Sequence, residues 1–441
     1  MSDEMKRQLT IWLVCLQAVV AWGGHIMIDG SYTSPEGSIY PGTTRTYQVY
    51  VPDQYDGTTP ACLYVGLDGV LCNAPAVMDS LIAIKKMPVT IGIFLQPGVI
   101  RDAQGEVIRY NRSNEFDMTD GTFARFLDEQ LLPHVLATST PDGRPLRISH
   151  RGNDHMIFGL SSGGICAFVA AWHRPDLFAR VFSGVGTFVA MRGGNDLQAI
   201  VRKHEPKPLR IFLQDGTNDV WNPLFGHWYE GNRMLASALE FAGYDCDFDW
   251  SDGGHNVKRS TEIFAQVMEW MWRDWPRPIQ VGTTQNDFLA PLLIPGEGWE
   301  LGPEEDFIAH PAAIYNADSS LRVTLAPFAN CLQQSVIIDG KACAEQDFYW
   351  LHSYDNRNLS IWDKAFDGEG NLWVVTSAGI QICDQNGRVR AILESPIRDH
   401  LADITIEDGL VKLRDRSFTY TRRFNVKAPI PGVRPKNQGQ G

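Results

Sequence analysis

The chain has 441 residues, of which 44% are hydrophobic, and a formal net charge of −13 at pH 7. This length and composition support a large core and more than one domain, and they exclude global disorder. The acidic balance, without a basic stripe to neutralise phosphates, argues against nucleic acid as a partner.

The N-terminal segment has the pattern of an export signal. Lys6 and Arg7 precede a mostly apolar run over residues 9–21. The run is too short and too broken for a membrane span. We therefore expect residues 1–21 to be a signal peptide, the mature chain to begin near Trp22, and the protein to be secreted or periplasmic. A cytoplasmic protein with an apolar first helix is the alternative.

The most informative motif is Gly159-Leu160-Ser161-Ser162-Gly163, which has the form G-x-S-x-G. An apolar run typical of a buried strand precedes it, and a run of small and apolar residues typical of a helix follows. A serine on a sharp strand-to-helix turn needs small flanking residues, which the two glycines supply. Ser161 is therefore the candidate nucleophile. Ser162 is a weaker one, because bulky Leu160 stands two residues before it.

A serine hydroxyl becomes a nucleophile when a base, itself oriented by an acid, removes its proton. Asp219 ends a Gly-Thr-Asn-Asp turn that follows a predicted strand at residues 209–214. His255 stands in a Gly-Gly-His turn after the next predicted helix and strand. The order Ser161, Asp219, His255 is that of the triad in α/β-hydrolases.

Both partners of the serine have competitors. Asp215 lies four residues before Asp219 and nearer the strand, where a carboxylate often caps the following turn. His173, His204 and His227 are competing bases, but His255 alone has both the glycine-rich turn and the position after the last strand.

The stretch from about residue 47 to residue 275 resembles the enterochelin-esterase and esterase-D-like branch of the α/β-hydrolases, which includes feruloyl and acetyl-xylan esterases. Besides the segments around the three candidate residues, the matching pieces are Tyr50-Val51-Pro52, residues 62–69, residues 111–117 and residues 126–133. The resemblance implies a doubly wound, mostly parallel sheet. One difference is Asp68-Gly69, where the family often has His-Gly; an extra carboxylate there would alter which leaving groups are accepted.

An oxyanion hole needs two backbone N–H groups aimed at the developing charge. One is expected from Ser162, at the start of the helix, where the helix dipole favours an anion. By position in the family, the other is expected from Val70. Trp221 and Trp228, near the acid loop, are candidate substrate-binding residues. We expect no cofactor and no metal, since no Cys/His spacing is typical of a zinc site.

The character of the sequence changes after the predicted esterase domain, residues 22–278. Residues 279–300 contain the proline and glycine residues of a linker. Residues 301–426 contain strand-like runs with acidic-glycine turns and resemble part of a gluconolactonase-like propeller, with room for about two or three blades, too few to close a ring. We expect a β-rich accessory module here, followed by a disordered tail over residues 427–441.

The cysteines give one further expectation. Cys331 and Cys343 are twelve residues apart around a predicted hairpin turn, and they are candidates for a disulfide in an oxidising compartment. Seven cysteines remain after the predicted signal peptide, and this odd number leaves at least one thiol unpaired within a monomer.

These features predict an exported serine carboxylesterase that cleaves feruloyl or acetyl esters of plant-type polysaccharides through an acyl-enzyme. The expected partner is an ester-bearing oligo- or polysaccharide. A siderophore ester hydrolase is a competing hypothesis, although it would favour a cationic cluster for a catecholate ligand, and the sequence has none. A lactonase and a non-catalytic polysaccharide-binding protein are two further hypotheses. The sequence leaves the oligomeric state open.

Overall fold

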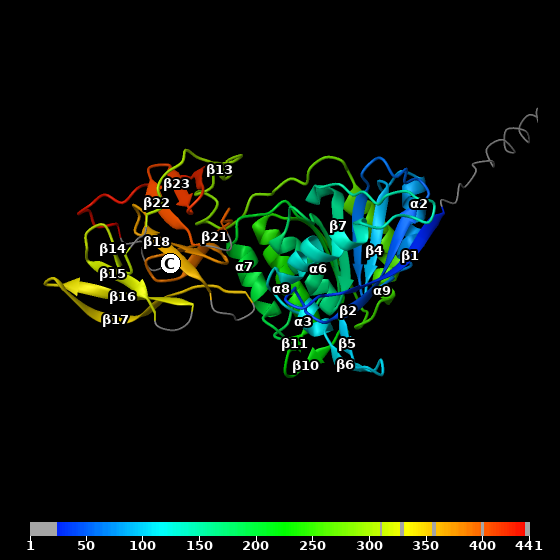
Figure 1. Ribbon diagram of the computed structural model, residues 1–441. Coiled ribbons are helices and arrows are strands. Elements are labelled where there is room, and N and C mark those ends of the chain that lie inside the picture. The colour runs from blue at the N-terminus through cyan, green and yellow to red at the C-terminus, as the bar shows by residue number, and fades with distance from the viewer. Residues whose placement is uncertain (1–23, 309–310, 327–329, 355–358, 398–400, 437–441) are drawn as a thin grey trace, which may run out of the picture.

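The computed structural model describes residues 24–308, 311–326, 330–354, 359–397 and 401–436. The predicted signal peptide, residues 1–21, lies outside the described residues. Within the part that is described, no helix combines the length and the apolar character that crossing a bilayer requires. Figure 1 shows two parts, an α/β domain on the right and a β-rich module on the left.

A ten-stranded mixed sheet forms the centre of the α/β domain. Its strands are β1 (His25–Thr33), β2 (Thr44–Pro52), β3 (Cys62–Leu67), β4 (Thr90–Leu95), β5 (Val99–Arg101), β6 (Val107–Tyr110), β7 (His155–Leu160), β8 (Arg180–Gly184), β9 (Arg210–Gly216) and β12 (Asp245–Ser251). The strands in the order β12-β9-β8-β7-β3-β4 are parallel, and β2 pairs antiparallel with β4 and β1. Every residue of β3, β4, β7, β8 and β9 is buried, as expected for parallel strands covered on both faces.

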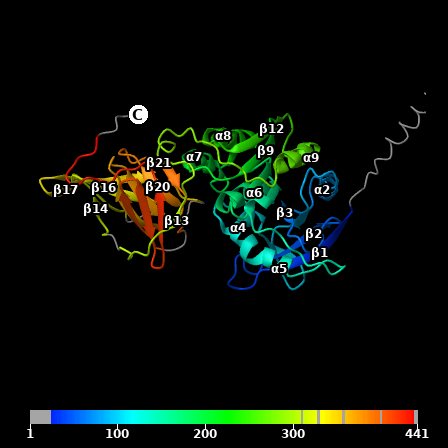
Figure 2. The same cartoon turned by 90° about the horizontal axis from the view of Figure 1, so that it is seen from above.

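Helices cover both faces of this sheet (Figure 2). They are α2 (Ala74–Ala83), α3 (Arg112–Phe116), α4 (Thr122–Phe126), the π-helical turn η1 (Leu127–Leu131), α5 (Leu132–Leu136), the short turns η2 (Gly152–Asp154) and η3 (Gly194–Asp196), α6 (Ser162–His173), α7 (Leu197–Lys203), α8 (Trp228–Ala242) and α9 (Lys258–Trp272). Residues of α2 and α9 share one apolar cluster, and residues of α4 to α8 share another. The predicted doubly wound α/β-hydrolase architecture is confirmed.

The parallel strands bring distant segments to one edge of the sheet. Asp68 follows β3, Ser161 follows β7, Asp219 lies three residues after β9 and His255 lies four residues after β12. The carboxyl ends of parallel strands share one edge, and this is where open α/β sheets place their ligand sites. A small hairpin of β10 (Trp221–Asn222) and β11 (Gly226–His227) leaves the same edge.

The C-terminal module consists of three four-stranded antiparallel sheets. Its strands are β13 (Glu300–Leu301), β14 (Ile314–Tyr315), β15 (Leu321–Leu325), β16 (Cys331–Ile338), β17 (Lys341–Trp350), β18 (Ile361–Phe366), β19 (Leu372–Thr376), β20 (Gly379–Cys383), β21 (Val389–Leu393), β22 (Asp403–Glu407), β23 (Leu410–Arg414) and β24 (Thr419–Arg423). In two of these sheets, β14 to β17 and β18 to β21, the strands lie side by side in the order in which they follow one another along the chain. The third joins β22 to β24 with β13, so the first and last strands of the module pair with each other.

The module packs on the end of the α/β domain that lies away from the serine. Trp172, near the C-terminus of α6, donates its indole N–H to the Tyr354 hydroxyl at 2.9 Å. Arg422 of β24 binds both carboxylate oxygens of Glu205. Ser161 stands at the other end of α6, and a helix of 12 residues is about 18 Å long. The module therefore contacts the domain far from the candidate nucleophile.

The contact between the two parts is buried and includes ionisable groups. Lys207 pairs with Glu394 of the module and donates to the carbonyl of Trp172. Burial lowers the pKa of His204 to about 3 and that of His173 to about 4. Both imidazoles are therefore neutral at physiological pH and serve the packing of the two parts.

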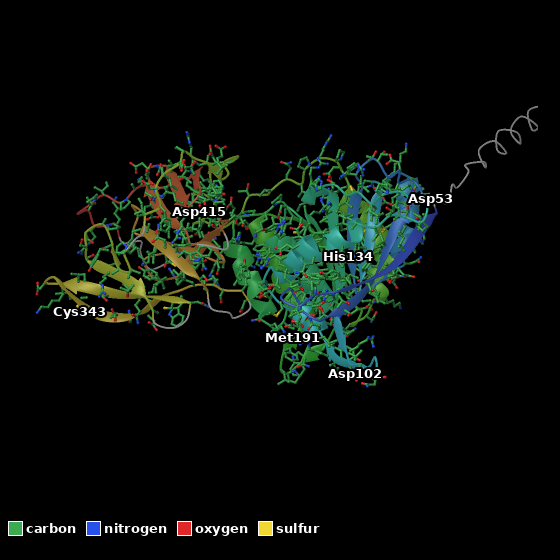
Figure 3. The ribbon with its side chains drawn as sticks, viewed as in Figure 1. Asp53, Asp102, His134, Met191, Cys343 and Asp415 are labelled. Atoms are coloured by element: carbon green, nitrogen blue, oxygen red, sulfur yellow. The ribbon has the colours of Figure 1, made fainter. Side chains whose placement is uncertain are left out.

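The structure corrects the expectation of a Cys331–Cys343 disulfide. All seven described cysteines are free thiols. In the β16–β17 ladder Cys331 lies opposite Trp350, and Cys343 lies opposite Val336. Cys331 is buried, whereas Cys343 is exposed at the outer end of the hairpin (Figure 3). A separation of twelve residues around a hairpin turn does not bring two cysteines within disulfide distance when the strand register places each of them opposite another residue.

The predicted linker and part of the predicted tail are held by contacts with the folded parts. Asn286, in the predicted linker, donates to the carbonyls of Arg202 in α7 and Arg390 in β21, so this segment is fixed to both parts. Residues 427–436 of the predicted disordered tail follow the module surface, where Arg434 pairs with Asp318. Residues 437–441 lie outside the described residues. A segment of polar and proline residues is held here by hydrogen bonds that its composition does not reveal.

Candidate active site

Ser161 occupies a strained turn between β7 and α6. Its backbone has φ 57° and ψ −120°, a conformation that L-residues rarely adopt and that is found at functional sites. Its N–H donates to the carbonyl of Gly184 at 2.9 Å. A Cβ atom added to Gly159 would lie 2.2 Å from the carbonyl oxygen of Gly163, so the turn closes only with glycine at this position. The motif therefore has the physical form that its sequence predicts.

The structure brings Ser161, Asp219 and His255 together. His255 Nε2 lies 2.8 Å from the Oγ of Ser161, and His255 Nδ1 lies 2.7 Å from Oδ1 of Asp219. The Asp219 carboxylate is fully buried, whereas the imidazole is partly exposed. Burial acts to raise the pKa of Asp219, but the hydrogen bond from His255 and contacts with Asp215 and Val220 hold that pKa below its ordinary value. The carboxylate is therefore ionised beside the imidazole.

Two loops from neighbouring strands hold the acid and the histidine at this distance. Asn218 donates its side-chain N–H to the carbonyl of Asp252 at 2.7 Å and its backbone N–H to the carbonyl of Gly253 at 3.0 Å. A Cβ atom on Gly216 would lie 2.1 Å from the oxygen of Gly253, so the loops approach too closely for any side chain there. The Gly-Thr-Asn-Asp sequence thus supplies both the close approach and the link between the loops.

Of the two predicted oxyanion-hole residues, Ser162 directly follows Ser161, and Val70 lies in the turn after β3. Ser162 is the first residue of α6, and the first N–H groups of a helix have no partner within it. Val70 stands in the turn after β3 and its side chain is 40% exposed. Across the described residues, neither N–H donates to another protein group. Both donors are therefore available to a substrate oxygen.

The turn that carries Val70 is fixed by an ion pair. Asp68 and Gly69 both have positive φ, 62° and 83°. Arg112 holds the Asp68 carboxylate through Nε at 2.7 Å and Nη2 at 2.8 Å, and it also reaches the carbonyl of Leu160 at 3.4 Å. The carboxylate that replaces the family's usual histidine is thus neutralised by Arg112, and the pair links the turn to the residue before Ser161.

The two tryptophans predicted to bind substrate have different environments. Trp221 is 65% exposed on the β10–β11 hairpin, two residues after Asp219. Trp228 is only 5% exposed, and its ring packs edge-on against His255 with centroids 5.9 Å apart. A buried ring offers no face on which a sugar can stack, which corrects the expectation for Trp228. Its sequence position does not distinguish a ring facing solvent from one packed behind the histidine.

Thr187 is a site residue that the sequence reasoning missed. Its Oγ1 lies 3.4 Å from the Oγ of Ser161 and accepts the indole N–H of Trp228 at 3.3 Å. Its backbone N–H donates to the carbonyl of Ser161 at 3.2 Å. Thr187 follows β8 in a Gly-Val-Gly-Thr segment. Its place after a parallel strand next to β7 is the sequence signal that could have found it.

The competing residues lie elsewhere or have other contacts. Asp215 is buried behind Asp219 and accepts the N–H of Gly216. His173 and His204 lie at the contact with the module. His227 belongs to β11. Over the described ranges, no three His, Cys, Asp or Glu side chains converge to hold a metal ion.

Comparison with solved structures gives low overall similarity. The chain is similar to a ferulic acid esterase, with TM-score 0.42 and 18% identity, over 57% of this chain and 98% of that one. It is similar to the enterobactin esterase of Shigella flexneri, with TM-score 0.42 and 21% identity, over 56% of this chain and 59% of that one. For the fluorophosphonate-binding serine hydrolase F of Staphylococcus aureus, the TM-score is 0.39 and the identity 17%, over 57% of this chain and 100% of that one.

Sequence families give a more direct result. No curated protein matches the chain. The Esterase family, described as "Putative esterase", matches residues 38–268, more than half of the 441-residue chain. The matched range contains the strand-to-helix serine turn and both loops that face it. The protein therefore belongs to the Esterase family of α/β-hydrolases and is a carboxylic ester hydrolase.

Proposed function

We propose that the protein hydrolyses esters through a serine acyl-enzyme mechanism. Ser161 attacks the ester carbonyl while His255 takes its proton at Nε2 and passes it to the departing alcohol. Asp219 holds Nδ1–H of the imidazole and stabilises the imidazolium that forms. Water then attacks the acyl carbonyl while His255 takes one of its protons. The bond between the acyl group and Ser161 Oγ breaks, the proton passes from His255 to Oγ, and the carboxylic acid leaves.

One observation carries this proposal: the hydroxyl, the imidazole and the buried carboxylate are joined by hydrogen bonds of 2.8 and 2.7 Å. The N–H groups of Ser162 and Val70 supply the stabilisation of the oxyanion. Donors of this kind, fixed before the reaction, are typically the largest single contribution to acyl transfer. The Asp68–Arg112 pair supports this role, because it fixes the turn in which Val70 stands.

We propose that the substrate is a feruloyl or acetyl ester on a plant-type polysaccharide. Exposed aromatic rings at the carboxyl edge of the sheet support a sugar or hydroxycinnamoyl ligand. Trp221 is 65% exposed two residues from Asp219, and Tyr110, which is 78% exposed, ends β6 two residues before Arg112. Such rings bind flat ligands on their apolar faces.

We further propose that the protein is exported, to the periplasm or outside the cell. The charge and apolar pattern of residues 1–21 support this, and an exported enzyme meets polymer fragments where they occur. N-terminal sequencing of the protein recovered from its native compartment tests the proposal. A mature N-terminus near Trp22 is expected, whereas an intact first residue in a cytoplasmic fraction would contradict export.

A rate panel tests the substrate. The purified protein is assayed with acetylated xylan oligosaccharides, feruloylated arabinose, long-chain aryl esters, a catecholate triester and an aldonolactone, each beside Ser161→Ala. The highest kcat/KM is expected for a sugar ester, and each activity should disappear in the variant.

Other rankings of the same panel point to other functions. A preference for the catecholate triester would favour a siderophore ester hydrolase. Lactone opening that survives in Ser161→Ala would assign a lactonase to another part of the chain. Absence of hydrolysis with retained binding to the oligosaccharides would favour a binding protein.

A further inference from the structure

A second carboxyl group lies directly behind the proposed catalytic acid. Asp215, near the end of β9, is fully buried, and its side chain lies against that of Asp219. One oxygen of Asp215 accepts the N–H of Gly216 and the other accepts Nδ2 of Asn232, each at 2.7 Å. Two carboxylates in contact inside a protein do not both stay ionised, because like charges at this distance repel strongly.

The contacts of Asp219 indicate which carboxyl holds the proton. Its Oδ1 accepts N–H groups from His255 and Val220. Its Oδ2 is buried, and among the described residues no amide, hydroxyl or cationic group donates to it. A buried carboxylate oxygen without a donor is costly. A proton on Asp215 supplies the donor that is missing.

The environments of the two carboxyl groups also indicate that Asp215 holds the proton. Burial, together with the hydrogen bond to Asp219 and the charge of that residue, raises the pKa of Asp215 to about 9. The contact with His255 lowers the pKa of Asp219, as described above. The pair therefore shares one negative charge at neutral pH, and the charge resides on the carboxylate that faces the imidazole.

We propose that Asp215 is a neutral positioning residue, whose O–H donates to Oδ2 of Asp219 and holds that carboxylate against His255. The inference rests on the proposed triad and deepens it. Asp215 acts through Asp219 and therefore sets the orientation of the base. It also keeps the charge behind His255 at −1, which is the charge that balances the imidazolium formed during catalysis.

A pH dependence follows from this arrangement. The groups that face Asp215 are Asp219 and, beyond it, His255 from the loop after β12, together with the neutral Asn232 of α8 and the N–H of Gly216. Loss of the proton as the pH rises towards 9 places two negative charges side by side and removes the donor to Oδ2. The Asp219 carboxylate then moves away from its partner, and kcat falls.

Two substitutions at one position test the proposal in the full-length protein. Asp215→Asn keeps the shape and an N–H donor but does not ionise, so kcat at pH 7 should stay within about threefold, and the fall above pH 9 should disappear. Asp215→Ala removes the donor and should lower kcat about tenfold or more, since small displacements of catalytic groups have effects of this size. The matched control is Asp252→Asn, which removes an exposed carboxylate nearby and should keep the alkaline fall.

Stability gives a second measurement that does not depend on activity. Asp215 in the folded protein holds its proton at pH values where the unfolded chain has released it. The contribution of Asp215 to the free energy of unfolding should therefore decrease as the pH rises from about 4 to about 9. Asparagine stays neutral in both states. The difference in melting temperature, Asp215→Asn minus wild type, should accordingly increase over this range.

Three outcomes would overturn the proposal: equal losses of kcat in Asp215→Asn and Asp215→Ala, an alkaline fall retained in Asp215→Asn, or a melting difference independent of pH. An additional infrared measurement keeps the test valid if the alanine variant does not fold. A protonated-carboxyl band at pH 7 should be present in the wild type and missing from Asp215→Asn. Failure of the triad itself would appear separately, as hydrolysis that survives in Ser161→Ala.

Discussion

The esterase domain and the C-terminal module both bury aspartates, but with different contacts. In the module, Asp367 accepts the backbone N–H groups of Glu369 and Asn371 and side-chain donors from Asn371 and Trp373. All of these donors lie within six residues of Asp367. Such an aspartate fixes the turn between two strands, β18 and β19.

In the esterase domain, Asp219 accepts a hydrogen bond from Nδ1 of His255, which is 36 residues away in the chain. The other ring nitrogen of His255 is hydrogen-bonded to the Oγ of Ser161. This contact joins three loops from the same edge of the sheet. Burial alone therefore does not identify a functional carboxylate. The distinguishing property is a donor that comes from another loop and is itself connected to a reactive group.

Removal of the nucleophile should have the largest effect. Ser161→Ala should lower kcat at least about 10⁴-fold, as removal of a serine nucleophile does in other hydrolases, and should abolish labelling by a fluorophosphonate. Ser162→Ala should retain substantial activity, because only its backbone N–H is proposed to act. Labelling that persists in Ser161→Ala, or equal losses in both variants, would contradict the assignment.

Removal of the charge on the acid should have the next largest effect. Asp219→Asn preserves the shape but favours the wrong imidazole tautomer, and kcat should fall about 10³-fold or more. Circular dichroism should show an unchanged fold. The contrast with Asp215→Asn makes the test specific, and a reversed order of the two effects would make Asp215 the acid.

A substitution in the module should affect stability alone. Arg422→Ala leaves Glu205 without its partner in a largely buried pair, so the free energy of unfolding should fall by about 3 kcal/mol. The kcat for a small aryl acetate should not change, because this contact lies at the far end of α6 from Ser161. Arg423→Ala, an exposed neighbour, is the control. A loss of activity in Arg422→Ala would show that the module reaches the active site.

Much of the fold and the positions of the three site residues could be predicted from the sequence. Gly159 and the glycine of the Gly-Thr-Asn-Asp turn, Gly216, have few physical explanations, because each permits a backbone approach that a side chain would block. Sequence order then placed Asp219 and His255 on loops after parallel strands. These sequence features involve residues that are close together in the chain or their order along it, so they can be recognised in a single sequence.

Other features depend on tertiary packing and were not predictable. The face on which Trp228 lies is decided by the packing of α8 against the His255 loop. The separation of Cys331 from Cys343 depends on the strand register, and the hydrogen bonds of residues 427–436 depend on a surface formed by distant strands. The pairing of Asp215 with Asp219 likewise needs atomic contacts, since the sequence alone also permits a simple turn cap.

The contact between Trp172 and Tyr354 has a consequence for the way the chain is made. The two residues are 182 positions apart. At about 5 to 20 residues per second, the ribosome needs about 10 to 40 s to add the intervening segment. Over that interval the part of the chain that has already been made has no module to cover the end of α6. A chaperone that binds exposed aromatic surface would have its longest opportunity there, and synonymous codons that slow translation between these positions should increase aggregation of the nascent protein.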